Sequence, residues 1–146
     1  MYRHILVPTD GSELAQKGVN HALALAKGLG SKVTIITATE PFPIMYGDAW
    51  VPNPEDYDRF ADENRKAASE LLERIRTEAA KLGVQADIEY IPDQNAASAI
   101  IDAAQRLICD LIVMSSHGRR GIKRTLLGSQ TSEVLGHSSI PVLVVR

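Results

Sequence analysis

The sequence predicts an α/β fold, a doubly wound parallel sheet of five strands in the order 3-2-1-4-5 with helices on both faces. Short apolar runs alternate along the chain with longer segments of helical periodicity, as expected for strands joined by crossover helices. Most of the apolar runs are continuous, which is typical of parallel strands that are covered on both faces.

Five runs are expected to form the strands. Pro8 stops the first run, because proline cannot donate a backbone hydrogen bond to a sheet. The third run alternates apolar and polar side chains, which marks a half-exposed strand at a sheet edge. The expected strands cover residues 5–7, 33–38, 84–90, 110–114 and 141–145.

Four segments with apolar residues at three- and four-residue steps are expected to form the helices. Ser12 suits the N-cap of the first helix, and Pro54 suits the first turn of a long second helix that ends at Gly83. Charged side chains cover the rest of that long helix, including Glu70 and Arg74 at i,i+4, and favour a solvated face over a binding patch. The expected helices cover residues 13–29, 54–82 and 96–107, with a last one opened by residues 128–129.

Composition limits the functional classes. A chain of 146 residues with 45% hydrophobic side chains is expected to form one domain over residues 1–146 with a substantial core. A net charge of −2 gives no basic field for nucleic acid, and no apolar run approaches the roughly 20 residues that span a bilayer. Met1 to His4 lead into a strand without the pattern of a signal peptide, and the single cysteine, Cys109, suits a cytoplasmic location.

An apolar loop is expected between the second strand and the long helix, over residues 39–53. Two interpretations are open. The loop either folds onto the surface as a lid over the core, or forms the wall of a ligand pocket or a partner contact. Its large apolar residues are Phe42, Ile44, Met45, Tyr46 and Trp50.

Two small polar loops are expected to meet at one edge of the sheet. In doubly wound sheets, ligands bind beyond the carboxyl ends of the strands where the strand order reverses. Here the loops at that point are residues 8–12 and 115–118, and Gly128 and Ser129 then open a helix whose N–H groups could face phosphate. Asp10 is placed to hold Mg²⁺ or ribose hydroxyls, with a turn-capping role as the alternative.

A basic cluster follows the second of these loops. Arg119, Arg120, Lys123 and Arg124 fit either the neutralisation of a triphosphate or a solvated surface loop. One short cluster without interleaved aromatic residues does not favour nucleic acid. His117, just before the cluster, fits either a general base or a structural role.

The chain resembles the universal stress protein family over essentially its whole length, which implies a Rossmann-like fold of the adenine nucleotide alpha hydrolase type. The ATP-binding branch of that family carries a glycine, two residues, a glycine, nine residues, and then glycine with serine or threonine. Gly118, Gly128 and Ser129 match this motif, whereas Ser115 stands where the first glycine is expected. The stretches that carry the resemblance are residues 5–12, 110–119, 126–129 and 141–145.

This resemblance implies an adenine nucleotide, ATP with Mg²⁺, as the ligand and a homodimer as the assembly. The implied nucleotide contacts are Pro8, Thr9, Asp10, Ala38, Met114, Ser115, Gly118, Gly128, Ser129 and Gln130, with Asp10 nearest any metal. The implied dimer contacts are Pro141, Val142, Leu143, Val144 and Val145. An apolar last strand left at a sheet edge would be exposed to aggregation, which independently favours pairing there.

Three functional hypotheses follow. The first is an ATP-binding regulatory or stress-response module that acts on a signalling partner. The second is a weak ATPase or autophosphorylating protein that uses Asp10, His117 and Arg120, although the chain carries no P-loop and no G-x-S-x-G nucleophile elbow. The third is a dimeric interaction module without nucleotide, which the serine at position 115 favours.

Overall fold

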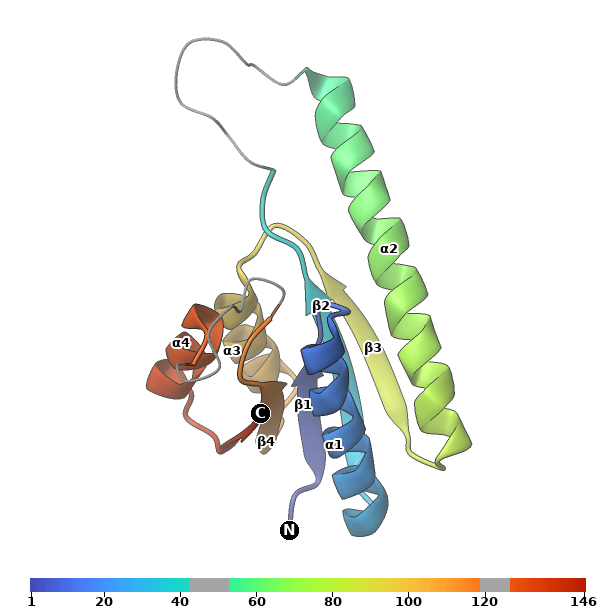
Figure 1. Cartoon of the computed structure of the whole chain (residues 1–146), viewed down its shortest axis with the longest axis vertical. Helices are drawn as coiled ribbons and strands as arrows, with labels where there is room; N and C mark the ends of the chain where they lie inside the picture. Colours follow the sequence, from blue (N-terminus) through green and yellow to red (C-terminus); the bar gives the residue numbers. More distant parts are fainter. Residues whose placement is uncertain (43–52, 119–126) are drawn as a thin grey trace.

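The computed structural model describes residues 1–42, 53–118 and 127–146 and contains one parallel sheet. The strands lie in the order β3-β2-β1-β4-β5, which confirms the predicted fold and strand order (Figure 1). The elements in chain order are β1 (His4–Pro8), α1 (Glu13–Leu29), β2 (Lys32–Ala38), α2 (Pro54–Lys81), β3 (Ala86–Ile91), α3 (Ala96–Arg106), β4 (Leu111–Ser115), α4 (Ser129–His137) and β5 (Val142–Val145).

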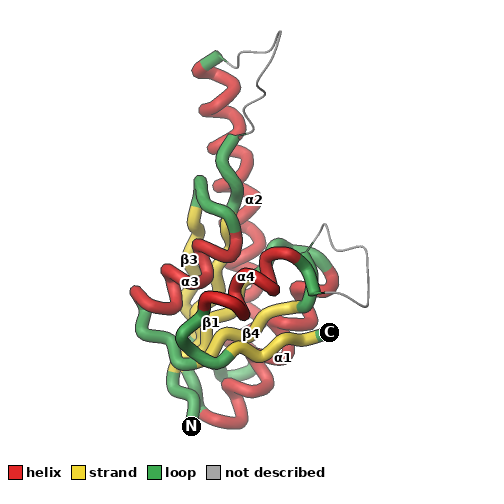
Figure 2. The backbone as a smooth tube through the Cα atoms, turned by 90° about the vertical axis from the view of Figure 1, so that its left-hand side faces the viewer, coloured by secondary structure: helices red, strands yellow, loops and turns green. Residues whose placement is uncertain are grey.

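Helices cover both faces of the sheet, and each face has its own core. On one face α1 and α2 bury residues such as Val19 and Ile75 against Ile35 of β2. Figure 2 shows α3 and α4 together on the other side of the sheet. There Ile100 and Val134 are buried against the opposite sides of the same strands. None of the helices in the described ranges is long and apolar enough to cross a membrane.

The helix boundaries follow the signals in the sequence. Ser12 is the N-cap of α1, and its side chain accepts a hydrogen bond from the N–H of Ala15. Asn53 caps α2 through a reciprocal capping box with Asp56, and Pro54 occupies the first turn. Gly30 ends α1 at a φ of 70°, a conformation that glycine adopts without steric cost.

Helix α2 extends well beyond the sheet. Its buried residues, from Ala68 to Ala79, all lie in its C-terminal part, whereas residues 54–67 project past the carboxyl ends of the strands (Figures 1 and 2). Near the projecting end, the ring of Phe42 lies 4.6 Å from that of Tyr57 and 4.9 Å from that of Phe60, centroid to centroid. Among the described residues, these two ring contacts are the only aromatic contacts that the projecting half makes.

At the opposite end of the sheet, Asp110 and His4 join the start of β1 to the end of α3. The carboxylate of Asp110 accepts hydrogen bonds from the N–H groups of Arg3 and His4. The His4 ring has Nδ1 3.1 Å from the Leu107 carbonyl and Nε2 2.7 Å from the Thr34 hydroxyl. Nδ1 therefore carries the proton and donates to the carbonyl, while Nε2 of the neutral ring accepts from the hydroxyl.

This arrangement predicts that the protein loses stability as the pH falls through about 6.5. Burial, and next the charge of Lys32, lower the pKa of His4 from its usual 6.5, so the unfolded chain binds the proton more readily than the folded one. The His4 contribution is complete above 6.5 and declines below it. Urea unfolding at a series of pH values should show this decline, and His4→Gln should flatten it. His21→Gln, the matched variant at an exposed histidine, should retain the decline. An unchanged pH dependence of the free energy of unfolding in His4→Gln would refute the assignment.

Ile108 holds an unusual conformation after α3. It has a φ of 55° and is 84% exposed, at the position directly after the C-cap Leu107, where glycine is usual. The left-handed region costs an L-residue roughly 1–2 kcal/mol, while glycine adds roughly 0.5–1 kcal/mol of unfolded-state entropy. We expect Ile108→Gly to raise the free energy of unfolding by up to about 1 kcal/mol in urea denaturation. Leu107→Gly, in a right-handed conformation, should lower it; a destabilised Ile108→Gly would contradict the strain argument.

Candidate functional site

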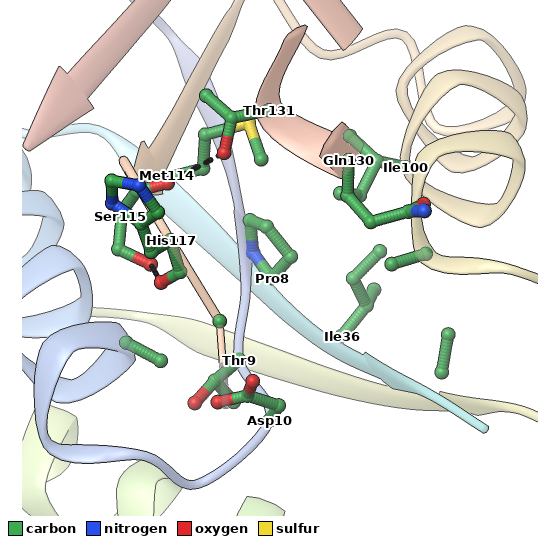
Figure 3. Close-up of a pocket in the computed structure, with 14 residues that line it drawn as sticks. Pro8, Thr9, Asp10, Ile36, Ile100, Met114, Ser115, His117, Gln130 and Thr131 are labelled. Atoms are coloured by element: carbon green, nitrogen blue, oxygen red, sulfur yellow. Dashed lines mark hydrogen bonds between the residues drawn. The ribbon is translucent and has the colours of Figure 1, made fainter. Parts of the chain in front are cut away.

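A cavity opens at the carboxyl ends of β1 and β4, the point at which the strand order reverses. Its volume is about 130 Å³, enough to enclose one part of a ligand while the rest lies at the open edge. Figure 3 shows the side chains around it. The lining residues are Pro8, Thr9, Asp10, Ala15, Ile36, Ala38, Ala96, Ile100, Met114, Ser115, His117, Gly118, Gln130 and Thr131.

One side of the cavity is apolar. Pro8, Ile36 and Met114 come from the ends of three neighbouring strands, and Ile100 of α3 completes this surface (Figure 3). Pro8 and Met114 are predicted site residues, whereas Ile36 and Ile100 are not. The alternation within β2 could have indicated Ile36, because it lies on the same face as the predicted Ala38 two residues later.

The turn after β1 is fixed by its own side chains. The Thr9 hydroxyl accepts a hydrogen bond from the N–H of Gly11 at 3.2 Å, and Asp10 Oδ1 accepts one from the N–H of Ser12 at 2.9 Å. Gly11 has a φ of 81°, in the region where glycine alone is unstrained. The Asp10 carboxylate is thereby held at the cavity.

The second loop lies directly against this carboxylate. A Cβ atom built on Gly118 would lie 2.7 Å from Asp10 Oδ2, closer than real Cβ contacts allow. A larger residue at position 118 would therefore displace the Asp10 carboxylate from its place at the cavity. The sequence places these residues far apart, and the reversal of strand order between β1 and β4 brings them together.

Hydrogen bonds shape the end of β4. Ser115 Oγ donates to the His117 carbonyl at 2.7 Å, and Thr131 Oγ1 lies 3.0 Å from the Ser115 carbonyl and 3.1 Å from that of Ser116 (Figure 3). The Ser116 hydroxyl lies 3.0 Å from His117 Nδ1. Ser115 is not among the non-glycine residues with a positive φ, so a serine fits this backbone without strain.

Helix α4 begins beside this loop. Gly128 is its N-cap, without a side-chain hydrogen bond, and the Gly128 N–H donates to the Ser116 carbonyl at 2.8 Å. A Cβ atom at position 128 would lie 3.2 Å from that carbonyl oxygen. Gln130 Oε1 accepts from the N–H of Ala97 at 2.8 Å and so joins α4 to the start of α3.

The structure brings eight of the ten predicted nucleotide contacts to the cavity wall. Gly128 and Ser129 are not part of that wall, but they form the adjoining N-terminus of α4. Arg119, Arg120, Lys123 and Arg124 lie outside the described residues. So do residues 43–52 of the expected apolar loop.

The acidic groups of the described residues form no cluster of three or more that could hold a metal ion. Of the carboxylates in the part of the chain that the structure describes, Asp10 alone lines the cavity. Mg²⁺ is typically held by one or two carboxylates together with phosphate oxygens of a ligand. The donor set thus fits a metal ion that arrives with a phosphate and does not fit a site built from protein alone.

Strand β5 lies at the edge of the sheet, paired on one side only, with β4. Residues 142, 144 and 145 are buried or half-buried, and Leu143 is 39% exposed. Pro141 precedes the strand and lacks an N–H, so the free edge begins at Val142. The predicted dimer contacts therefore include an exposed apolar edge.

Known proteins of similar sequence match the whole length of this chain. A family model described as the universal stress protein family matches residues 1–146. A universal stress protein of Thermus aquaticus is 33% identical over 147 residues, with all of both chains covered. Universal stress protein YxiE of Bacillus subtilis is 32% identical over 150 residues, also with both chains fully covered.

Solved structures agree with the sequence comparisons. Universal stress protein UspA from Lactobacillus plantarum superposes with a TM-score of 0.84 at 24% identity, covering 99% of this chain and 98% of that one. A universal stress protein in complex with cAMP gives a TM-score of 0.65 at 27% identity, covering 99% and 97%. The Archaeoglobus fulgidus protein in complex with dAMP gives 0.67 at 20%, covering 99% and 98%. The chain belongs to the universal stress protein family.

Proposed function

We propose that this protein is an ATP-binding regulatory module of the stress response that binds its nucleotide in the cavity between β1 and β4. The observation that carries the proposal is the division of the cavity into an apolar side and a polar, glycine-lined loop end. The relatives that hold cAMP and dAMP support an adenine nucleotide as the ligand class.

The two ends of the cavity suit the two ends of a nucleotide. Pro8, Ile36 and Met114 offer an apolar surface to a base. Gly118 and the N-terminus of α4 at Gly128 let backbone N–H groups approach phosphate, which the helix dipole favours. Asp10 between them would hold ribose hydroxyls or a phosphate-borne Mg²⁺, where the ion would neutralise phosphate charge.

We further propose that the protein acts as a homodimer in the cytoplasm. The free, partly exposed edge of β5 supports antiparallel pairing with a second copy, which would cover Leu143. Cys109 is a buried free thiol, and burial raises its pKa to about 11, so it remains protonated and suits a reducing compartment. A signalling partner would then recognise the nucleotide-bound dimer.

Calorimetric titration of the nucleotide-free protein tests the central proposal. ATP with Mg²⁺, AMP and cAMP are titrated separately, with GTP as the control for base selectivity. Saturable binding of an adenine nucleotide with a dissociation constant near micromolar, about −8 kcal/mol, supports the proposal. Absence of binding up to millimolar concentrations overturns it and favours an interaction module without nucleotide.

The variant Ser115→Gly tests the one departure from the family motif. It removes the Cβ that faces the cavity and the hydrogen bond to the His117 carbonyl. If the serine side chain crowds a nucleotide, ATP affinity rises in this variant. If the hydrogen bond shapes the loop instead, affinity falls and Ser115 is part of the site. Unchanged affinity would place the nucleotide away from residue 115.

A further inference from the structure

A second and larger cavity lies between the carboxyl ends of β1 and β2 and the inner side of α2. Its volume is about 590 Å³. The turn at Asp10 and Gly11, residues 37–39 at the end of β2, and side chains between Asn64 and Arg74 of α2 line it. We call it the α2 groove. Figure 1 shows α2 passing beside the ends of the strands and continuing beyond them.

The first observation is a buried hydroxyl, that of Thr37, at the wall of the groove. Thr37 is 5% exposed, its side chain lines the α2 groove, and no hydrogen bond joins its hydroxyl to any described residue. Its oxygen is not sealed from solvent, so it is reachable from the groove. Because solvent reaches this hydroxyl and no described residue bonds to it, it is free to donate to or accept from a ligand that enters the groove. All the other buried serine and threonine side chains in the described ranges have partners, namely Thr9, Ser31, Thr34, Ser115, Ser116 and Thr131.

The second observation is a pair of oppositely charged side chains at the groove, Glu70 and Arg74. Their i,i+4 spacing would allow an ion pair, yet the described residues contain none between them. Both side chains line the α2 groove and have no hydrogen bond or ion pair within the described part of the chain. The other arginines of α2 each pair with an acidic residue three positions earlier, namely Arg59, Arg65 and Arg76.

We propose that the α2 groove binds a small zwitterion with one carboxylate and one ammonium group, the chemical class of a free amino acid or a short peptide. The Arg74 guanidinium suits a carboxylate, which it can bind through two parallel hydrogen bonds. The Glu70 carboxylate suits the ammonium group, and the Thr37 hydroxyl can bond to either. Among the described residues, the groove is lined by two carboxylates and one guanidinium, a balance that disfavours a polyanion such as a second nucleotide.

The groove shares two residues with the nucleotide cavity. Asp10 and Ala38 line both. A ligand in the α2 groove therefore contacts the turn that holds Asp10, and we expect each ligand to alter the affinity for the other by the same factor. The groove itself does not depend on nucleotide binding, because its unbonded side chains belong to β2 and α2.

Amide NMR of nucleotide-free protein tests the groove directly. The standard amino acids and a set of dipeptides are titrated singly, and we expect saturable shifts at the amides of Gly11, Thr37 and Asn64 with at least one of them. The N-acetyl and the carboxamide forms of the binding compound should each bind at least tenfold more weakly. Amino acids and dipeptides form separate arms of the experiment, so the result also identifies the source. Absence of saturable shifts, or equal binding of the N-acetyl form, overturns the proposal.

Variants locate the contacts. Arg74→Gln and Glu70→Gln should each weaken binding at least tenfold, while Arg65→Gln and Glu63→Gln, on the same helix but outside the groove, should not. Thr37→Val removes the hydroxyl with little change in shape, so it should weaken binding while the protein remains folded or becomes more stable. Unaltered affinity in both Arg74→Gln and Glu70→Gln would refute the assignment even if a ligand bound elsewhere.

Discussion

Gly118→Val is expected to reduce adenine nucleotide affinity at least about tenfold, equivalent to about 1.4 kcal/mol. The first atom of the new side chain would lie 2.7 Å from Asp10 Oδ2, so the Asp10 carboxylate must shift. A shift of this carboxylate would disturb the hydrogen bond that its Oδ1 accepts from the Ser12 N–H. The remaining valine atoms would occupy the open edge of the cavity, where we place the ribose and phosphates.

The measurement is calorimetry on wild-type and variant protein, with circular dichroism to show that both are folded. Gly136→Ala is the matched control, because a Cβ at that position of α4 meets nothing within 4 Å and alanine favours a helix. The control should keep wild-type affinity. Full affinity in Gly118→Val would show that the nucleotide does not use the contact between the two loops.

Ile75→Ala is expected to lower the free energy of unfolding by about 2–5 kcal/mol. Ile75 is fully buried in the core that α1 and α2 form with the sheet. Truncation leaves a cavity that rigid strands on one side and helices on the other cannot close. Nucleotide affinity should be unchanged at low temperature, because Ile75 is not part of the cavity between β1 and β4.

Urea denaturation measures this loss, with Leu82→Ala as the control. Leu82 is 42% exposed at the C-cap of the same helix, so its truncation should change stability by no more than about 0.5 kcal/mol. Similar losses in both variants would mean that the C-terminal end of α2, rather than the buried contact, determines stability.

The fold could be predicted because its signals are local. Continuous apolar runs, the N-cap Ser12, and Gly30 after α1 each follow from a few neighbouring residues, and handedness rules then leave few topologies. The alternating third run was placed correctly at a sheet edge, where β3 lies. Strand ends differ from the prediction by one or two residues, as expected when hydrogen bonding rather than hydropathy defines them.

The site could be predicted only in part, because much of it depends on contacts between distant segments. The close approach of Gly118 to Asp10, and of Gly18 in α1 to the backbone of Ser115, exists only once the sheet has formed. Ile100 belongs to the cavity wall through the packing of α3, which no motif records. The spacing of Glu70 and Arg74 does not decide whether they pair, because it brings two side chains within reach but does not choose their rotamers.

Because α2 is buried only in its C-terminal half, its two halves should exchange their amide protons on different time scales. Residues 54–67 have no fully buried side chain, so the capping box at Asn53 and the local helical hydrogen bonds must hold that half nearly alone. Isolated helices of this length are marginal in water, whereas residues 68–81 can open only when the core around Ile75 opens. A single continuous helix therefore belongs to two cooperative units. Its first half should exchange amide protons by local fraying, and its second half only on global unfolding.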